Sequence, residues 1–535
     1  MNLYILENKI KNLLKKNLDK KIYIQISNKL KFFIVKDEEL GDYSTNLIFL
    51  LDKYAPNKKN EILEKIKKIL KNEFDRFEIV NNYLNFYISN YALLKTFRDF
   101  AKKGPNFFKK NYGRNQKVNI DYVSANPTGP LTLGNTRGAV LGDALANVLK
   151  LCGFKVTKEY YVNDRGGQIE KLGKTALAYL NQIPWEDDLY QGQYIKEIAL
   201  KFKKAERFKN NPEKFGKKIA DYILRFFIKP TLKKFKTFHD VYLFESQLYK
   251  GDLKNKVLNI LKKHHLLEQK EGALFLLLTK LGEHKDEVLI KQNGEATYFL
   301  SDIIHYFYKF LIKKTKIDIL IVASDHLDHT RRLKSALKIF KIKEYQFQPI
   351  VYQFLHIKKR NEILRMSKRR GVFITLDELM QEIHPDIIRF FFLQKSPEVI
   401  IEFNLELAKQ QSEDNPYWYV QYSYARLKNI LKKSKIKDFR KFDPQKIFIE
   451  IEKSKEFLSL IKSIYKFQDL IYIVYKDKKV HLLTEFLIET AKKIHSVYEK
   501  EKILPSPQKV AFIYHLSNFI SFILSLINIS AVEKM

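Results

Sequence analysis

Two short segments of this 535-residue sequence carry residue types that could hold phosphate groups. The first, Asn126 to Asn135 (NPTGPLTLGN), leads into a helical pattern, and Gly134 at the helix entrance would let the backbone approach a ligand closely. The free N–H groups of that helix N-terminus would favour an anion. The second, Arg365 to Gly371 (RMSKRRG), gathers four cationic side chains, which repel one another unless an anion lies among them. Taken singly, a structural loop and a solvated charged loop remain open as alternatives for the two segments.

Two other groups of residues could take part in binding. Tyr298 and Asp302 are four residues apart and would share one face of a helix. The alternative is a partly buried tyrosine beside an aspartate that caps its own helix. The run Ser324 to His329 (SDHLDH) combines two aspartates with two histidines, which suits a transition metal. It also follows an apolar run, at a place where parallel sheets bind ligands.

Other chemistries find no support in the sequence. There is no G-x-x-x-x-G-K-[ST] and no G-x-G-x-x-G after a strand, so neither a P-loop nor a dinucleotide site is indicated. The single cysteine, Cys152, excludes an intrachain disulfide and a cysteine-based zinc site.

No segment reads as a targeting signal or a membrane span. The N-terminal stretch lacks the apolar core of a signal peptide. The apolar tail from Phe512 to Val532 is interrupted by polar residues, as in a buried bundle helix. We therefore expect a cytoplasmic protein that does not enter a membrane.

A parallel sheet would position the candidate residues. Short runs rich in β-branched residues predict strands, and one region between them has helical periodicity. The predicted strands are Val118 to Val123, Val156 to Val162, Ile317 to Ala323 and Pro349 to Leu355, and the predicted helix is Arg137 to Leu151. The order strand, Gly/Pro-rich loop, helix, strand is typical of a nucleotide-binding α/β sheet.

The chain is too long for one hydrophobic core, and its patterns suggest three parts. Residues 1–95 mix helical and strand patterns, with a helix expected over Ile62 to Leu70 and a strand over Asn82 to Ile88. Residues 96–410 hold the sheet signals and a lysine-rich, mostly helical insertion at about 175–280. Residues 411–535 are helical throughout.

The charge balance suits a polyanionic partner. Lys plus Arg number 97 against 61 acidic residues, a formal net charge of +36. Nucleic acid is favoured over a membrane surface. Most of the excess is lysine, however, and a proteome rich in lysine would give the same balance without any binding role.

Taken together, the motifs resemble a known family, the class I aminoacyl-tRNA synthetases, and within it the arginyl-tRNA synthetases. The first segment lies where the family has its His-x-Gly-His signature, and RMSKR resembles the family's Lys-Met-Ser-Lys-Ser signature. Further similar segments run in the family's order along the chain: Gly41 to Asn46 (GDYSTN), Glu159 to Ile169 (EYYVNDRGGQI), Lys285 to Ile290 (KDEVLI), Ala296 to Ile303 (ATYFLSDI) and Asp414 to Leu427 (DNPYWYVQYSYARL).

The resemblance implies a fold and a reaction. The fold would be a Rossmann-like parallel-sheet catalytic domain with an N-terminal α+β domain that contacts tRNA and a C-terminal all-α anticodon-binding bundle. The reaction would join L-arginine to tRNA-Arg with ATP through an arginyl-adenylate. Mg²⁺ would accompany the ATP phosphates, and the family tends to be monomeric.

The resemblance also assigns roles to residues. Catalysis would fall to Thr132, Asn135 and Lys368. ATP would be bound by Pro127, Gly129, Leu133, Gly134, Asp325, His326, Met366 and Ser367. Arginine would be bound by Ser124, Asn126, Tyr298 and Asp302, and tRNA by Tyr422 and Arg426.

One departure from the family signature raises an alternative function. Thr132 and Asn135 stand where the family usually has two histidines, although both remain neutral hydrogen-bond donors. A catalytically silent tRNA-binding relative is therefore one alternative. A metal-dependent hydrolase built on the Asp/His cluster is another, and a synthetase of the same class for a different amino acid is a third.

Overall fold

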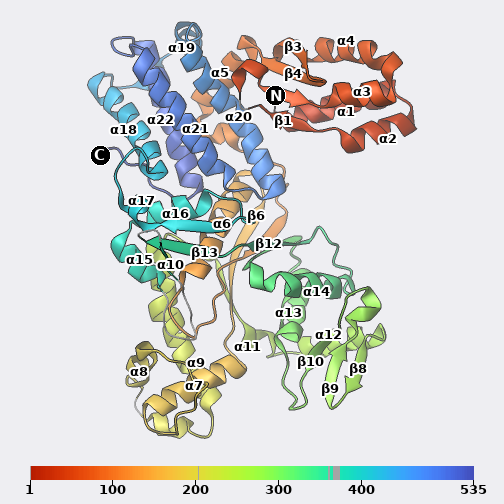
Figure 1. The fold of residues 1–535 in the computed structure, drawn as a ribbon, viewed down its shortest axis with the longest axis vertical. Helices are drawn as coiled ribbons and strands as arrows, with labels where there is room; N and C mark the ends of the chain where they lie inside the picture. The colour runs from red at the N-terminus through yellow and green to blue at the C-terminus, as the bar shows by residue number, and fades with distance from the viewer. Residues whose placement is uncertain (1, 36, 203, 360–361, 365–373, 535) are drawn as a thin grey trace. The chain divides into compact units, whose positions relative to one another are not determined.

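The computed structural model describes residues 2–35, 37–202, 204–359, 362–364 and 374–534. The chain divides into two compact units. One comprises residues 1–109, 418–525 and 530–535, and the other comprises residues 110–417 and 526–529. Figure 1 colours the chain from red at the N-terminus to blue at the C-terminus.

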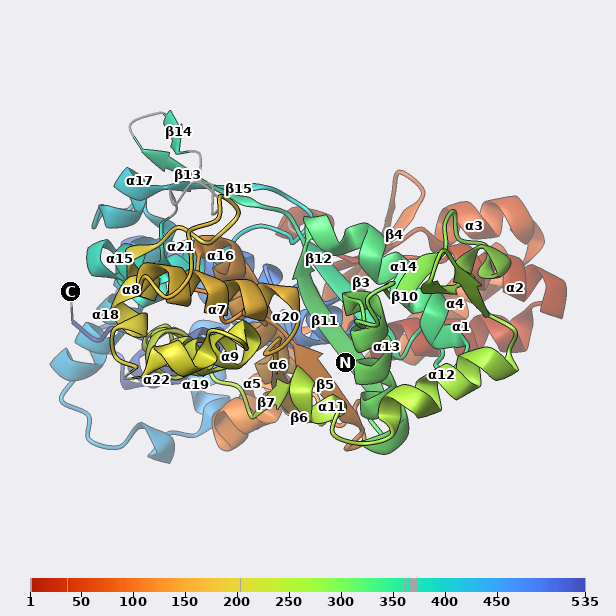
Figure 2. The same cartoon turned by 90° about the horizontal axis from the view of Figure 1, so that it is seen from below.

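A five-stranded parallel sheet forms the centre of the second unit (Figures 1 and 2). The strand order is β12-β11-β5-β6-β7, and every adjacent pair runs parallel. The strands are β5 (Lys117–Asp121), β6 (Lys155–Val162), β7 (Val241–Phe244), β11 (Ile317–Ala323) and β12 (Phe347–Tyr352). The loops after these strands open at one edge of the sheet, where such folds bind ligands. The predicted parallel α/β sheet is confirmed.

Helices connect and cover the parallel strands. The long helix α6 (Leu133–Leu151) follows β5 and packs so closely on the sheet that Gly142 lies against the ring of Tyr122. Helices α7 and α9 pack against each other through Gly173 and Gly216, where a Cβ atom would collide with the facing backbone. The helices before β7 are α7 (Gly167–Tyr179), α8 (Gln193–Ala199), α9 (Pro212–Ile223) and α10 (Lys229–Lys234).

Two smaller sheets complete this unit. The antiparallel sheet β10-β9-β8 shares a hydrophobic core with helices α12, α13 and α14. These elements are α11 (Glu245–Leu248), α12 (Leu253–Lys263), β8 (Leu267–Lys270), β9 (Ala273–Leu276), β10 (Glu287–Ile290), α13 (Tyr298–Phe307) and α14 (Leu327–Lys338). The third sheet has the order β14-β13-β15. Its elements and neighbours are β13 (Leu355–Lys359), β14 (Glu362–Leu364), α15 (Leu376–Glu382), α16 (Pro385–Leu393), β15 (Ile401–Asn404) and α17 (Leu405–Lys409).

The structure differs from the predicted elements at several boundaries. The first strand ends at Asp121 because Val123 and Ser124 adopt positive φ angles of 69° and 33°, which extended backbone cannot continue. The region predicted as a mostly helical insertion also contains β7, a full member of the parallel sheet, and the strands β8 and β9. These strands have four residues each, too few for a periodic pattern to show in the sequence.

The N-terminal part of the first unit is an antiparallel sheet with helices. The strand order is β1-β2-β4-β3, with every pair antiparallel. The elements are α1 (Leu3–Asn17), α2 (Lys20–Lys29), β1 (Phe32–Ile34), β2 (Tyr43–Thr45), α3 (Leu47–Tyr54), α4 (Lys59–Leu70), β3 (Phe74–Val80), β4 (Tyr83–Ile88) and α5 (Asn90–Lys103). The predicted helix at Ile62 to Leu70 and the predicted strand at Asn82 to Ile88 correspond to α4 and β4.

The C-terminal part of the first unit is helical, as predicted. Its helices are α18 (Pro416–Lys433), α19 (Pro444–Ile451), α20 (Lys455–Asp477), α21 (Leu482–Lys500) and α22 (Pro507–Leu526). Helix α22 is long and apolar enough to cross a membrane by length and composition, but 67% of its most apolar window is buried inside the protein. A membrane span would direct these side chains toward lipid, so the burial favours a core helix.

The segment GDYSTN (residues 41–46) packs on α20 within this unit. Asp469 on α20 accepts a hydrogen bond from Tyr43 Oη at 2.5 Å and another from the backbone N–H of Leu3. Asp42 is fully buried and forms ion pairs with Lys462 at 3.1 Å and Lys466 at 3.0 Å. Buried charges of this kind persist only when they are paired, so the segment fixes the N-terminal sheet against the helical bundle.

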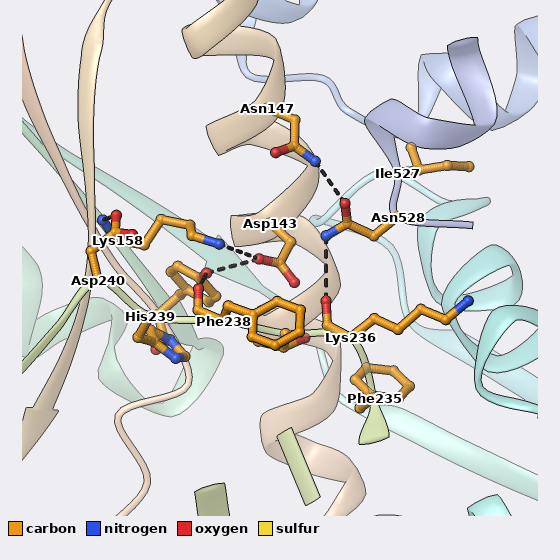
Figure 3. Close-up of polar contacts among 12 residues, drawn as sticks. Asp143, Asn147, Lys158, Phe235, Lys236, Phe238, His239, Asp240, Ile527 and Asn528 are labelled. Carbon is orange, nitrogen blue, oxygen red and sulfur yellow. Dashed lines mark hydrogen bonds and ion pairs between the residues drawn. The ribbon is translucent and has the colours of Figure 1, made fainter. Parts of the chain in front are cut away.

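The last residues of the second unit come from the C-terminal end of the chain (Figure 3). The side-chain amide of Asn147 on α6 donates to Leu526 O and to Asn528 Oδ1, both at 3.0 Å. Figure 3 shows the second of these hydrogen bonds. The amide of Asn528 donates in turn to Lys236 O at 3.4 Å. The C-terminal segment therefore ties α6 to the loop before β7.

The buried carboxylate of Asp143 on the same helix contacts residues of the parallel sheet. Asp143 accepts hydrogen bonds from Tyr122 Oη at 2.9 Å and from Lys158 Nζ at 3.4 Å. Figure 3 shows the contact with Lys158. It also faces the guanidinium of Arg389 at 3.4 Å. Burial, followed by the charge of Asp143, raises the pKa of Tyr122 well above its ordinary value, which keeps the phenol a donor.

Candidate active site

A cavity of about 840 Å³ opens at the carboxyl ends of the parallel strands. Residues that follow β5, β6, β7, β11 and β12 all contribute to its walls. The cavity brings together most of the predicted site residues from three separate parts of the sequence. Those that line it are Ser124, Asn126, Thr132, Gly134, Asn135, Tyr298, Asp302, Asp325 and His326.

Helix α6 presents its N-terminus to this cavity. Thr132 is the N-cap residue, and its hydroxyl does not cap the helix but donates to Asn135 Oδ1 at 3.1 Å. With its oxygen occupied, the Asn135 amide has its two N–H groups left for a ligand. Gly134 is exposed, and its carbonyl accepts from Tyr352 Oη at 2.9 Å. The loop thus combines backbone and side-chain donors in the way an anion requires.

Three other predicted residues of this loop do not line the cavity. Leu133 is buried in the core, and Pro127 is also buried. Gly129 lies against the hydroxyl of Tyr194, which donates to Thr128 O at 2.7 Å. These residues therefore shape the loop, and any contact with a nucleotide would use their backbone.

The predicted residues Met366, Ser367 and Lys368 lie outside the described residues. The chain that follows them returns to the first loop, where Thr375 forms a β-bridge with Thr132 and the N–H of Leu376 donates to Leu131 O at 2.9 Å. Thr375 then begins α15 with a capping box to Glu378. The described chain after the second candidate segment, from Thr375 onward, therefore lies beside the first candidate loop.

The predicted pair Tyr298 and Asp302 lies on helix α13 at the cavity. Thr297 is the N-cap of this helix, and its hydroxyl accepts from Leu300 N. Asp302 does not cap the helix but accepts a hydrogen bond from His329 Nε2 at 2.6 Å. Burial lowers the pKa of His329. The hydrogen bond and the charge of Asp302 raise this pKa by more than burial lowers it, so the pKa of His329 lies above its ordinary value. The capping alternative for Asp302 is wrong.

Glu245 is a cavity residue that sequence reasoning missed. It follows β7, is buried, and accepts a hydrogen bond from Ser301 Oγ at 2.7 Å. Burial raises its pKa to about 7. Together with Asp121, Asp302 and Asp325 it gives the cavity four carboxylates, which suits a ligand with positive charges. Sequence reasoning could have found Glu245 only by recognising strand β7 directly before it, and this strand has only four residues.

Polar contacts also fix the loop after β5. The Asn126 amide donates to Gln168 Oε1 at 2.7 Å. Ser124 Oγ donates to Asp121 Oδ1 at 2.5 Å and accepts from Tyr161 N at 2.9 Å. Asn126 is therefore held from α7, whereas Ser124 is held between β5 and β6.

The Asp/His cluster does not converge on one point. Asp325 and His326 are exposed at the cavity mouth after β11. His329 pairs with Asp302, whereas Asp328 pairs with Arg331 at 2.9 Å. Within the part of the chain that the structure describes, metal-ligand spacing occurs in a different group, Asp121, Glu159 and His305. The structure gives no support to the metal-dependent hydrolase.

The predicted tRNA-binding residues lie on α18 in the helical bundle. Arg426 donates to Tyr422 Oη at 2.9 Å, and its other nitrogen lies 2.9 Å from His495 Nδ1. Its guanidinium also stacks 4.1 Å over the Tyr422 ring and 4.7 Å over the Tyr498 ring. Both predicted residues are partly exposed, so this aromatic and cationic group can stack with a base.

Comparison with known families gives the same three-part organisation. Residues 100–396 match the family described as "tRNA synthetases class I (R), catalytic domain". Residues 420–535 match the "DALR anticodon binding domain", and residues 8–88 match the "Arginyl tRNA synthetase N terminal domain". The fold and the site therefore define a class I tRNA synthetase.

Individual relatives narrow the class to one family. The chain is 32% identical over 524 residues to an "Arginine--tRNA ligase" of Acetivibrio thermocellus, covering 94% of this chain and 93% of the relative. A putative arginyl-tRNA synthetase structure from Campylobacter jejuni has a TM-score of 0.76 and 26% identity, covering 84% of this chain and 100% of that one. The Thermus thermophilus arginyl-tRNA synthetase shares the fold at a TM-score of 0.79, with 21% identity and full coverage of both chains. The chain belongs to the arginyl-tRNA synthetase family.

Proposed function

We propose that this protein joins L-arginine to tRNA-Arg at the expense of ATP. The observation that carries the proposal is a single cavity that is lined both by carboxylates and by the donor-rich N-terminus of α6. A cationic amino acid and a triphosphate can therefore bind side by side. The curated relatives are named as ligases, so the comparisons do not support the catalytically silent alternative.

We assign the recognition of arginine to carboxylates that line the cavity. Arginine carries a guanidinium and an α-ammonium, and planar guanidinium groups bind best to carboxylates and other acceptors in a plane. Asp302 and Glu245 lie next to the phenol of Tyr298 and supply these acceptors. Asn126 and Ser124 also line the cavity, and we assign them to contact the bound amino acid.

The first chemical step is adenylate formation. An oxygen of the arginine carboxylate attacks the α-phosphorus of ATP, the bond between that phosphorus and the bridging oxygen breaks, and pyrophosphate leaves with the electron pair. Asn135 donates to the phosphates, Thr132 orients it, and Lys368 follows the pyrophosphate. ATP enters as its Mg²⁺ complex, so the metal belongs to the substrate, and the enzyme contributes positioning and charge neutralisation.

The second step transfers the arginyl group. A ribose hydroxyl at the tRNA 3′ end attacks the carbonyl carbon, the mixed anhydride bond breaks, and AMP leaves as the hydroxyl gives up its proton.

We assign Tyr422 and Arg426 to anticodon stacking. We further propose a monomer in the cytoplasm, with α22 as a core helix of the bundle.

Charging of a tRNA-Arg transcript with labelled arginine and ATP tests the proposal. Wild-type protein should charge the transcript, Lys368→Ala should lose roughly 10²-fold or more in rate, and the exposed Lys263→Ala on α12 should behave as wild type. An uncharged transcript that still binds tightly would instead establish the silent relative. Equal loss in both lysine variants would remove Lys368 from the mechanism.

A further inference from the structure

A buried ion cluster lies beneath the part of the cavity wall that Asp121 and His305 form. Lys309 Nζ is 2.8 Å from Glu159 Oε1, 3.1 Å from Asp318 Oδ2 and 3.4 Å from Asp121 Oδ2. The side chain of Lys309 is only 3% exposed, and the three carboxylates come from adjacent strands of the parallel sheet. Three carboxylates around one ammonium leave this region with an excess of negative charge.

The cluster reaches the cavity through two of its neighbours. Asp121 lines the cavity and is held by Ser124. His305 also lines the cavity, and its Nε2 lies 2.9 Å from Glu159 Oε1. Lys309 and Asp318 lie below them and do not line the cavity, so they act on a substrate only through Asp121 and Glu159.

Lys309 continues the helical stripe that forms the arginine-binding wall. Tyr298, Asp302, His305 and Lys309 recur at helical spacing and therefore share one face of α13 and the turn that follows it. Exposure falls along this stripe, from 48% at Tyr298 to 3% at Lys309. Residues 308–312 form a π-helical turn, a local widening that often marks a functional position.

Asp121, Glu159 and His305 have the spacing of a metal site, with ligand atoms within 4.8 Å of one another. The ammonium of Lys309 supplies the cation at this place. Burial raises the pKa of Glu159, but Lys309 and His305 outweigh it and bring the value to about 2. Burial raises the pKa of Asp318 to about 6, and it also raises that of Asp121.

We propose that Lys309 is a positioning residue for arginine recognition, which holds the Asp121 carboxylate charged and aimed into the cavity. The proposal rests on the proposed function. The buried amine outside the cavity cannot touch the substrate. It acts by keeping three adjacent carboxylates ionised where they would otherwise repel one another and lack solvent.

The change Lys309→Met keeps the length of the side chain and removes its charge. Without the ammonium, the buried carboxylates take up protons near neutral pH, and Asp121 loses its attraction for a positive substrate. The KM for arginine should then rise roughly tenfold or more at pH 7, while the KM for ATP stays close to wild type.

The pH dependence separates this role from a loss of packing. The titratable groups around Lys309 and Asp121 are Glu159, Asp318, His305, Tyr306, Tyr160 and Tyr161, and Glu245 and Asp302 line the same cavity. As pH rises, the carboxylates of the variant lose their protons again. The ratio of its arginine KM to that of wild type should therefore fall between pH 7 and pH 9.

Lys158→Met is the matched control, because it removes another buried lysine that forms an ion pair, this one on strand β6. Lys158 pairs with Asp143 and does not line the cavity (Figure 3). It should cost stability in thermal unfolding yet leave the arginine KM ratio near one at every pH. If Lys309→Met does not fold, the double variant Lys309→Met with Asp318→Asn removes one charge of each sign and carries the same test.

Two results would overturn the proposal. One is an arginine KM ratio that does not change with pH in a folded variant. The other is a parallel rise of the arginine and ATP KM values, which would mean general distortion of the cavity. If wild-type protein itself fails to charge tRNA-Arg, the proposed function fails before Lys309 is tested.

Discussion

At the level of single residues, the unusual feature is the pair Thr132 and Asn135 in place of two signature histidines. The hydroxyl of Thr132 donates to Asn135 Oδ1, so the pair acts as one oriented donor instead of two independent ones. An oriented neutral amide loses little freedom when the phosphate charge develops. The pair can therefore serve the same step without titrating near neutral pH.

The two members of this pair should have unequal effects. Asn135→Ala removes the donor and should lower kcat for charging by roughly 10²- to 10³-fold. Thr132→Val keeps the donor but releases its orientation, and we expect a loss of about tenfold. Steady-state charging kinetics at saturating arginine and ATP measure both. A Thr132→Val variant as impaired as Asn135→Ala would show that the hydroxyl itself contacts the phosphates.

At the level of elements, the predictable parts were those with long patterns. Strands β5, β6 and β11 have apolar runs that local sequence reveals, and the stripe on α13 already placed Tyr298 and Asp302 together. Glu245 could not be predicted because β7 has four residues and its pairing with β6 joins segments about 80 residues apart. The contact of the C-terminal segment with α6 could not be predicted from the sequence either, because no local pattern encodes it.

That contact predicts a specific loss of stability. Asn147→Ala removes two hydrogen bonds from α6 to Leu526 and Asn528, and should lower the free energy of unfolding by about 1–3 kcal/mol. Urea unfolding followed by circular dichroism measures the change.

Asn429→Ala provides the matched comparison, because Asn429 is an exposed residue of helix α18. Alanine favours a helix there, so stability should stay equal or rise slightly. Equal effects of the two substitutions would mean that the C-terminal segment contributes nothing to the second unit.

At the level of the whole molecule, the structure shows where the charged side chains behind the net charge of +36 lie. The cavity is lined by four carboxylates and has two more buried beneath it, whereas lysine occupies three of the five exposed positions of helix α12. We propose that the protein combines an acidic site for a cationic amino acid with a basic exterior for a polyanion. Whether the basic exterior binds tRNA or only reflects a lysine-rich composition is open to a direct test.

Salt separates these two explanations. Each phosphate contact releases counterions from the nucleic acid, so affinity falls steeply with ionic strength. Raising KCl from 50 to 200 mM should raise the KM for tRNA-Arg by roughly tenfold or more. The KM for arginine should change far less, because two of the carboxylates that line the cavity, Asp121 and Glu245, are buried and therefore shielded from solvent ions. A tRNA KM that shifts no more than the arginine KM would mean that the lysines do not bind tRNA and follow from composition alone.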